Sequence, residues 1–514
     1  MTTAWTRELD EAGVVRLAEL LALKIAAGDV IALSGALGTG KTTFARALIG
    51  ALLREEAVEV PSPTFSLAQA YATRRLTVTH FDFYRLNSAE EARELGFEEA
   101  MDNGVVIVEW PERAPALLPT ARYDIELAET DDPAVRRVTM RGHGGDAVRN
   151  VRRIGELMAF LATQDRWRPA RISYLQGDAS TRSYARLHAP SGTVLLMDAP
   201  RQPDGPPIRD GKPYSRIALL AEDMVRPFTA IGSALRAAGL SAPEVLAADL
   251  DKGLLLVEDL GDRLFGAAIA AGDSQAELWR TAVDALIVLR GVPVPPRLPL
   301  PDGTNYTLPR RDRAAFEIEI ELLLDWLWPA VKGAPAPASI RAEFAALWTP
   351  VLDRLLALPA GWFLRDYHSP NLIWLPARKG VARVGILDFQ DALNESFAFD
   401  LVSLLQDARV DVPADLEREL FAHYCREVKA REPAFDPAGF AAAYADFGAQ
   451  RNTRLLGLWA RLLRRDGKPQ YLQHFPRTWG YLLRNLRNPS LAPLAAWYER
   501  HFPPDVRSAK LLPG

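Results

Sequence analysis

The sequence predicts a chain of several domains, in which an α/β domain precedes an α+β part with a small strand-rich region and a large, mostly helical region. Its 514 residues suggest about three compact units of roughly 150 residues each. Strand-like and helix-like segments alternate over residues 1–140, whereas long amphipathic helices dominate after residue 260. These observations predict two structural classes within one chain.

The composition is that of a folded, water-soluble protein, with 48% hydrophobic and 25% charged residues. The net charge of -4 excludes an overall basic field that would attract nucleic acid. The single cysteine, Cys425, excludes an intrachain disulfide and a multi-cysteine zinc site. The N-terminal residues lack the basic and apolar regions of a signal peptide, and charges interrupt the longest apolar runs. We therefore expect a cytoplasmic protein without a membrane segment.

The first domain is expected to contain a largely parallel sheet, because strands and helices alternate. We expect strands at residues 29–33, 77–81 and 105–108, and a helix at residues 41–53. Turn and linker composition at residues 141–146 predicts a boundary, so that the domain covers residues 1–143.

The second part is expected to divide into a small mixed region over residues 150–260 and a large helical region over residues 261–514. A helix is expected at 150–163 and strands around 172–176, 184–187 and 194–197, and the pattern changes to long amphipathic helices after residues 254–258. Proline-rich segments at 292–301 and 333–337 predict breaks between the later helices.

Residues 35–42, Gly-Ala-Leu-Gly-Thr-Gly-Lys-Thr, match the phosphate-binding pattern G-x-x-x-x-G-K-[ST] between a strand and a helix. Glycines let backbone N–H groups close around phosphate oxygens, and the helix N-terminus adds its dipole. Lys41 is expected to reach the β- and γ-phosphates, and the Thr42 hydroxyl to bind Mg²⁺. The nucleotide-binding residues expected here are Gly35, Gly38, Thr39, Gly40, Lys41 and Thr42.

Three further segments, residues 61–67, 80–86 and 106–111, follow the phosphate loop. Together with that loop they resemble the TsaE family, the small ATPase of bacterial tRNA threonylcarbamoyladenosine synthesis, over nearly all of residues 1–140. The resemblance implies an α/β P-loop NTPase that works with TsaB and TsaD partners and meets tRNA only indirectly.

The same resemblance implies roles for four residues. Thr64 would lie in the loop that senses the γ-phosphate, and Trp110 beside the nucleotide. Asp82 and Glu109 end strands near the phosphates, where a carboxylate holds Mg²⁺ or orients the attacking water. Two alternatives stay open: Asp82 as a helix cap or surface acid, and Trp110 as a packing residue. His80 is expected to be structural.

A second constellation combines residues 364–371, Leu-Arg-Asp-Tyr-His-Ser-Pro-Asn, with residues 384–391, Val-Gly-Ile-Leu-Asp-Phe-Gln-Asp. An aspartate, an asparagine five residues later and a strand-borne Asp-Phe follow the pattern of a kinase catalytic loop. Asp366 is expected to accept the proton of the acceptor hydroxyl, and Asn371 and Asp388 to hold Mg²⁺. A hairpin over residues 373–386 is expected to return Asp388 to the loop.

This pattern resembles the aminoglycoside phosphotransferase family, which has a bilobal, protein-kinase-like α+β fold. Residues 176–187, 196–200 and 400–409 narrow the resemblance to the AmgK group of anomeric sugar kinases, over roughly residues 150–490. It implies phosphorylation of N-acetylmuramate or N-acetylglucosamine at the anomeric hydroxyl during cell-wall recycling. The two resemblances together imply one Mg-ATP at each of two sites.

Two departures from the general kinase pattern bear on the nucleotide. Residues 194–198, Val-Leu-Leu-Met-Asp, lack the usual lysine, and the glycine-rich loop is reduced to residues 177–180. Ser180, Arg182 and Arg186 are therefore expected at the nucleotide, with an arginine in place of the lysine. His368 is expected to order the catalytic loop.

Several alternatives remain open for the second part. Asp391 and Asp400 contact the sugar or brace the loop. The missing lysine favours a pseudokinase scaffold that regulates the ATPase, whereas Asp366, Asn371 and Asp388 argue against it. A kinase for an aminoglycoside would need an acidic cleft, and one for choline an aromatic box. The tryptophans around residues 325–328 and Trp348 are expected in the core.

Overall fold

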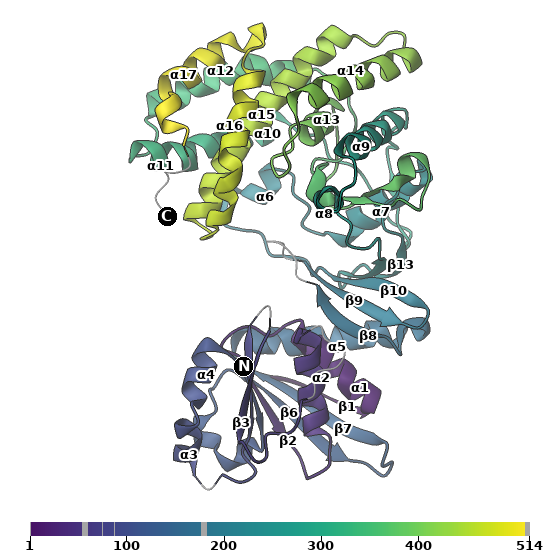
Figure 1. Cartoon of the computed structure of the whole chain (residues 1–514), viewed down its shortest axis with the longest axis vertical. Coiled ribbons are helices and arrows are strands. Elements are labelled where there is room, and N and C mark those ends of the chain that lie inside the picture. Colours follow the sequence, from purple (N-terminus) through teal and green to yellow (C-terminus); the bar gives the residue numbers. More distant parts are fainter. Residues whose placement is uncertain (1, 54–59, 74–75, 87, 176–181, 509–514) are drawn as a thin grey trace. The chain divides into compact units, whose positions relative to one another are not determined.

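The computed structural model describes residues 2–53, 60–73, 76–86, 88–175 and 182–508. The chain forms two compact units, Met1–Pro200 with Val245–Asp259, and Arg201–Glu244 with Leu260–Gly514 (Figure 1). The first unit thus contains the strand-rich region as well as the N-terminal domain, while Arg201–Glu244 belongs with the helical unit. The domain boundaries expected from the sequence stay predictions.

The first unit holds a seven-stranded sheet in the order β1-β7-β6-β2-β5-β4-β3. Its strands are β1 (Thr2–Asp10), β2 (Val30–Ser34), β3 (Ala68–Ala72), β4 (Thr77–Asp82), β5 (Gly104–Glu109), β6 (Arg122–Glu129) and β7 (Val135–His143). The central pairs β2–β5, β2–β6 and β4–β5 are parallel. The expectation of a largely parallel sheet is wrong at the edges, where β1–β7, β3–β4 and β6–β7 are antiparallel. Few residues separate β3 from β4 and β6 from β7, and short connections join antiparallel strands.

Helices cover this sheet on both faces. They are α1 (Glu11–Ala22), α2 (Lys41–Leu53), α3 (Ala89–Glu94), α4 (Phe97–Asn103) and α5 (Gly145–Ala162), with short turns η1 (Pro111–Arg113), η2 (Pro115–Leu117) and η3 (Asp165–Trp167). The linker expected at residues 141–146 is instead a tight strand-to-helix junction. Its glycines are needed there, because a Cβ on Gly142 would lie 2.3 Å from the Ala147 carbonyl oxygen, and Gly144 has φ +76°.

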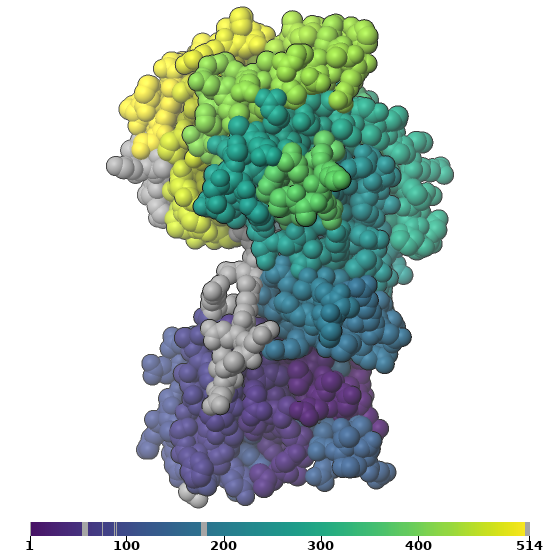
Figure 2. Space-filling view, turned by 45° about the vertical axis from the view of Figure 1, so that its right-hand side comes forward, coloured from purple at the N-terminus to yellow at the C-terminus, as the bar shows by residue number. Residues whose placement is uncertain are grey.

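A second, five-stranded antiparallel sheet in the same unit has the order β13-β14-β10-β9-β8. Its strands are β8 (Arg171–Leu175), β9 (Ser183–Ala189), β10 (Gly192–Asp198), β13 (Val245–Asp249) and β14 (Leu254–Glu258). Figure 1 shows α1, α2 and α5 between the two sheets, and Figure 2 shows the purple N-terminal surface directly against the blue surface of these strands. Alternate strand residues, among them Ile172, Leu187 and Leu196, join one buried core with Leu17 of α1 and Leu48 of α2. The N-terminal domain and the strand-rich region therefore share a hydrophobic core.

The second unit is built of helices around the long α15. They are α6 (Tyr214–Ile217), α7 (Val225–Ala237), α8 (Phe265–Ala270), α9 (Gln275–Arg290), α10 (Arg313–Leu322), the π-helical η4 (Leu323–Leu327), α11 (Trp328–Lys332), α12 (Ala338–Leu356), α13 (Ala398–Leu405), α14 (Ala414–Arg431), α15 (Pro437–Arg464), α16 (Phe475–Asn485) and α17 (Ala492–His501). Trp328 and Trp348 are buried, which confirms them as core residues, whereas Trp326 is only partly buried.

Short hairpins and turns complete the second unit. The hairpin strands are β11 (Pro207–Arg209) with β12 (Lys212–Pro213), β15 (Leu298–Pro299) with β16 (Asn305–Tyr306), β17 (Gly361–Phe363) with β20 (Leu393–Glu395), and β18 (Leu372–Trp374) with β19 (Val384–Ile386). The turns are η5 (Ser369–Asn371), η6 (Gly380–Arg383), η7 (Pro469–His474), η8 (Pro489–Leu491) and η9 (Pro504–Val506). In the described ranges, none of the helices has both the length and the apolar character needed to cross a membrane.

Candidate functional sites

The phosphate loop joins β2 to α2 and owes its shape to glycine backbone. Gly35, Gly38 and Gly40 have φ of +141°, +81° and +102°, a region that side-chain-bearing residues rarely adopt. A Cβ on Gly35 would lie 2.2 Å from the carbonyl oxygen of Leu127. Thr39 is buried, and its hydroxyl donates to a carbonyl oxygen within the loop at 2.9 Å. The predicted loop residues thus form one compact turn.

Lys41 is buried at the start of α2. Its Nζ donates to the carbonyl oxygens of Gly35 and Ala36, both at 2.8 Å, and burial lowers the pKa of this amine. The same Nζ lies 3.9 Å from the centre of the Trp110 ring, which in turn lies 5.0 Å from the Tyr84 ring. Trp110 also has φ +60°, a strained conformation for a tryptophan. The structure therefore brings the predicted lysine and tryptophan together.

Glu109 ends β5 and is buried beside Thr42. The Thr42 hydroxyl lies 2.9 and 3.2 Å from the two carboxylate oxygens of Glu109. The Nε2 of His80 lies 3.0 Å from Glu109 Oε1, and His80 is fully buried. His80 thus holds the carboxylate, and the two predicted Mg²⁺ ligands, from a helix and a strand, are in direct contact.

Asp82 ends β4, the neighbouring parallel strand, in register with Glu109. Its Oδ2 accepts from the hydroxyls of Ser62 and Thr64, both at 2.9 Å, and its Oδ1 accepts the backbone N–H of Tyr84. Because Asp82 is only 3% exposed and precedes no helix directly, the alternative of a helix cap or surface acid is wrong. The structure brings Thr64, Asp82 and Glu109 to the same edge of the sheet.

In the second unit, the catalytic-loop pattern forms a chain of tight turns between β17 and β18. Asp366 N–H donates to the Leu364 carbonyl oxygen at 2.9 Å, and Asn371 Nδ2 donates to the Asp366 carbonyl oxygen at 2.9 Å. His368 Nε2 lies 3.9 Å from Asp366 Oδ1, and burial lowers the pKa of this imidazole. The His368 side chain is 18% exposed and lies beside Asp366, and its role in ordering the loop stays a prediction.

The hairpin expected after the loop is present, with β18 and β19 paired antiparallel. It ends where Leu387 N–H donates to the Asn371 carbonyl oxygen at 2.9 Å, so the next residue, Asp388, lies close to Asn371. Asp388 has φ +56°, and its Oδ1 accepts from Gln390 Nε2 at 3.0 Å. The hairpin thus brings the two predicted Mg²⁺ ligands of this site together.

Asp400 on α13 settles one open alternative. It is 1% exposed and accepts the backbone N–H groups of Leu364 and Arg365 at 2.6 and 2.9 Å. Burial raises the pKa of this carboxyl to about 7. Asp400 therefore braces the catalytic loop, which is one of the two roles considered for it.

Arg365 is a functional residue for which the sequence analysis assigned no role. Its guanidinium donates to Glu319 at 2.8 Å and to the carbonyl oxygens of Ala218 and Leu219 at 2.9 and 3.1 Å. Burial alone would raise the pKa of Glu319, but Arg311, Arg454 and Arg365 outweigh it and lower the value to about 2. In the sequence, Arg365 could have been noticed because it directly precedes Asp366. The role of Glu319 could not be found in this way, since a glutamate in an amphipathic helix normally faces water.

A pocket of about 390 Å³ in the second unit opens beside Asp391. Asp391 Oδ1 accepts the backbone N–H of Ala221 at 2.7 Å, and its Oδ2 accepts from Gln390 Nε2 at 3.1 Å. Gln390 thus bridges Asp391 to Asp388. Burial raises the pKa of Asp391. This residue ties the loop and also lines the pocket, and its contact with a sugar stays a prediction.

The charged groups of this pocket are largely paired. Glu222 binds Arg216, and Asp223 lies 3.1 Å from Arg226. Tyr306 is the aromatic residue among the lining side chains. The pocket is therefore neither a strongly acidic cleft nor an aromatic box.

The strand that lacks lysine is β10, and Arg186 lies opposite its Leu195 in the antiparallel register. Arg186 binds Asp259, with Nε–Oδ2 at 2.6 Å and Nη2–Oδ1 at 3.0 Å. Arg182 lies just before β9, and Ser180 lies outside the described residues. The nucleotide role of these three residues stays a prediction.

Within the described part of the chain, no group of three or more His, Cys, Asp or Glu side chains forms a ready-made metal centre.

Comparison with known proteins gives two family matches. The model described as "Threonylcarbamoyl adenosine biosynthesis protein TsaE" matches residues 9–138, and "Phosphotransferase enzyme family" matches residues 171–442. The N-acetylmuramate/N-acetylglucosamine kinase of Caulobacter vibrioides is 40% identical over 357 residues, 68% of this chain and 96% of the relative. That of Pseudomonas aeruginosa is 31% identical over 335 residues, 63% and 87% respectively. The TsaE protein of Rickettsia felis is 41% identical over 117 residues, 23% of this chain and 68% of the relative.

These matches confirm the predicted fusion and its fold classes, an α/β P-loop NTPase domain and an α+β protein-kinase-like phosphotransferase. They also confirm that the chain is an enzyme of ATP-using families. The chain therefore belongs to the TsaE family in its N-terminal part and to the phosphotransferase family of N-acetylmuramate/N-acetylglucosamine kinases in the remainder.

Proposed function

We propose that the chain carries two separate ATP-dependent activities. The second phosphorylates the anomeric hydroxyl of N-acetylmuramate or N-acetylglucosamine in cell-wall recycling, and the first supports formation of tRNA N6-threonylcarbamoyladenosine. The observation that carries the kinase is the loop in which the Asn371 side chain binds the Asp366 carbonyl oxygen, while the Asn371 carbonyl oxygen accepts the N–H of Leu387, the residue before Asp388. Both reactions use ATP, so we place both in the cytoplasm.

In the kinase reaction, Asp366 accepts the proton of the sugar hydroxyl while that oxygen attacks the γ-phosphorus of ATP. The bond from the γ-phosphorus to the β,γ-bridging oxygen breaks, and ADP leaves. Asn371 and Asp388 supply an amide oxygen and a carboxylate, the ligands that suit Mg²⁺. Bound Mg²⁺ would neutralise the phosphate charge in the transition state. Asp400 and Arg365 keep the loop backbone fixed, so that Asp366 remains aligned with its substrate.

The pocket beside Asp391 is the proposed acceptor site. Its volume lies within the range of small-molecule sites, and Asp391 and Gln390 offer groups that bind sugar hydroxyls. Its paired charges do not favour a polycationic aminoglycoside, and its single aromatic lining residue does not favour choline. We therefore favour a hydroxyl-rich sugar ring that carries no positive charge.

In the ATPase, Lys41 and the loop N–H groups would bind the phosphates of ATP. Thr42 and Glu109 form a hydroxyl–carboxylate pair suited to Mg²⁺, and Asp82 with Thr64 lies within reach to orient a water. Leu37, Phe65 and Tyr84 around this site are 76%, 86% and 42% exposed. Such an apolar patch is typical of a protein contact, and we propose that TsaB/TsaD-like subunits dock on it.

One experiment tests both activities. The full chain with Mg-ATP is given each sugar, and sugar phosphate formation is measured together with sugar-independent ATP hydrolysis. Asp366→Asn should abolish sugar phosphorylation, and Lys41→Ala should abolish the background hydrolysis while sparing the kinase. Asp411→Asn, at an exposed aspartate, is the matched control. The kinase proposal is overturned if neither sugar is phosphorylated, or if Asp366→Asn leaves turnover intact.

A further inference from the structure

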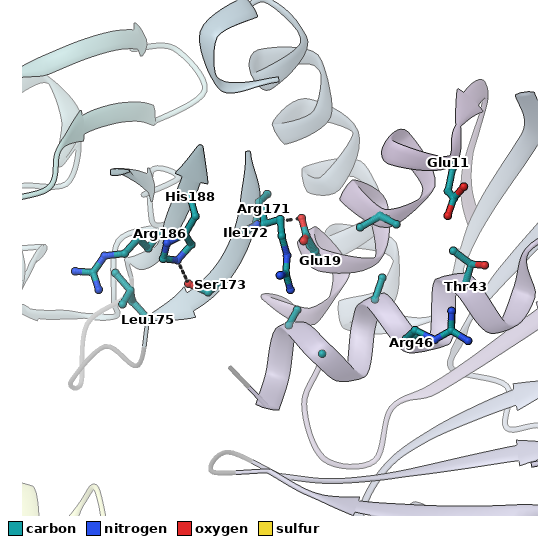
Figure 3. Close-up of a pocket in the computed structure, with 14 residues that line it drawn as sticks. Glu11, Glu19, Thr43, Arg46, Arg171, Ile172, Ser173, Leu175, Arg186 and His188 are labelled. Carbon is teal, nitrogen blue, oxygen red and sulfur yellow. Dashed lines mark hydrogen bonds between the residues drawn. The ribbon is translucent and has the colours of Figure 1, made fainter. Parts of the chain in front are cut away.

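A cavity of about 500 Å³ lies within the first unit, and Arg186 is the one lining residue that is also expected at a proposed catalytic site, that of the kinase nucleotide. Figure 3 shows its walls, which are helices α1 and α2 on one side and strands β8 and β9 on the other. The α2 wall includes Thr43 and Arg46, which follow the phosphate-loop residues Lys41 and Thr42. The β8 wall ends at Leu175, directly before the reduced glycine-rich segment of the kinase sequence. The cavity therefore adjoins elements of both catalytic modules.

Two arginines enter the cavity from opposite walls. Arg46 comes from α2, and its Nε donates to the Val60 carbonyl oxygen at 3.3 Å. Arg171 comes from β8, where it pairs with His188, and among the described residues its guanidinium has no hydrogen-bond or ion-pair partner, although its charge acts on Glu19. Most of the N–H donors of these two guanidinium groups are thus available to a ligand.

The carboxylates of the cavity compensate this charge only in part. Glu19 of α1 is buried, accepts the backbone N–H of Ile172 at 3.1 Å and lies 3.7 Å from Arg16 Nε. Burial raises the pKa of Glu19 to about 7, so part of its negative charge is lost at neutral pH. Glu11 is the second carboxylate among the lining residues.

The remaining charged groups on the β9 wall have partners. Arg186 binds Asp259, and His188 Nε2 lies 2.8 Å from Ser173 Oγ. The cavity consequently keeps a positive balance that rests on Arg46 and Arg171.

Arginine recognises phosphate through parallel N–H donors, and the cavity volume lies in the range of small-molecule sites. Val15, Ala47 and Leu175 add apolar surface for a ring, and the hydroxyls of Thr43 and Ser173 add polar contacts. We propose that this cavity binds an organic phosphate. The phosphate would contact both α2 of the ATPase domain and β8 of the strand-rich region of the kinase. A sugar phosphate, a nucleotide and free phosphate share this chemistry.

The test measures binding to the full chain by calorimetry. A non-hydrolysable ATP analogue and N-acetylglucosamine are present throughout, so that the two proposed catalytic sites are filled. Separate arms use N-acetylglucosamine 1-phosphate, uridine monophosphate and inorganic phosphate. Binding does not require turnover, so this result is independent of the success of the kinase assay.

Arg46→Ala and Arg171→Ala should each raise the Kd of the phosphate that binds by about tenfold or more, because each removes charge-assisted hydrogen bonds. Arg149→Ala, at an exposed arginine of α5 outside the cavity, should leave the Kd unchanged. The arm that binds identifies the source of the phosphate. The proposal is overturned if no arm binds, if neither cavity variant weakens binding, or if Arg149→Ala weakens it equally.

Discussion

The two catalytic sites of this chain hold their acidic residues in different ways. Glu109 is held by Thr42 and His80, side chains of the same sheet and its adjoining helix. Asp366 depends on Arg365, whose guanidinium is in turn held by Glu319 of α10, 46 residues earlier in the sequence. A substitution at the first site should therefore act locally, whereas the second site is sensitive to changes deep in the helical core.

The largest effect is expected for Glu319→Gln, which tests the buried support of Asp366. Glu319 is 1% exposed and lies 2.8, 3.2 and 3.8 Å from the guanidinium groups of Arg365, Arg311 and Arg454. Loss of its charge removes the buried carboxylate partner of Arg365 and Arg454, while Arg311 keeps Glu395 at 2.9 Å, and this loss costs about 3–5 kcal/mol of unfolding free energy. Chemical denaturation should show this loss, and kcat for sugar phosphorylation should fall as the loop loosens.

The matched control is Glu317→Gln on the same helix, which should change stability by less than about 1 kcal/mol. Background ATP hydrolysis should be equal in both variants, because the ATPase site lies in the other unit. Equal stability of Glu319→Gln and wild type would contradict the proposed dependence of the catalytic loop on the core.

The next effect, Glu109→Gln, tests whether the first site acts locally. The amide would keep a hydrogen bond to the Thr42 hydroxyl or to His80 but would lose the negative charge suited to Mg²⁺. ATP hydrolysis should fall on the order of 10²–10³-fold, the usual loss when one electrostatic contact of a transition state is removed. Stability and sugar phosphorylation should stay near wild type, as they should in Glu129→Gln at an exposed end of β6. A parallel loss of kinase activity would show that the sites are coupled.

The same contrast explains what could be predicted from the sequence. The phosphate loop and the pair Asp366 and Asn371 lie within short contiguous motifs, where residue spacing alone determines geometry. The hairpin that returns Asp388 was also predictable, since its strands are near neighbours in the chain. Residues separated by only a few positions in a known motif can adopt few relative geometries, so their arrangement follows from the sequence.

Contacts between distant segments could not be predicted. Glu319, Asp400 and Arg365 meet only after the helices pack, and a buried glutamate looks like a surface residue in the sequence. The glycines of residues 141–146 indicated a linker, whereas Gly142 serves a close approach of β7 to α5. The sequence also did not indicate that α1, α2 and β8–β10 share one core. Apolar periodicity shows which face of an element is buried, but not which element packs against it.

The smallest effect concerns the contact between the two modules of the first unit. Burial raises the pKa of Glu19 to about 7, above its ordinary value of 4.5. The folded chain therefore holds this proton more tightly than the unfolded chain, so stability falls as pH rises from about 4.5 to 7. In Glu19→Gln this titration is absent, and the amide oxygen still accepts the Ile172 N–H. Between pH 5 and pH 8, wild type should lose about 2–3 kcal/mol more unfolding free energy than the variant. Urea unfolding of both proteins, with Glu11→Gln as the exposed control on the same helix, measures the difference, and parallel pH curves would show that Glu19 is not shielded from water at this contact.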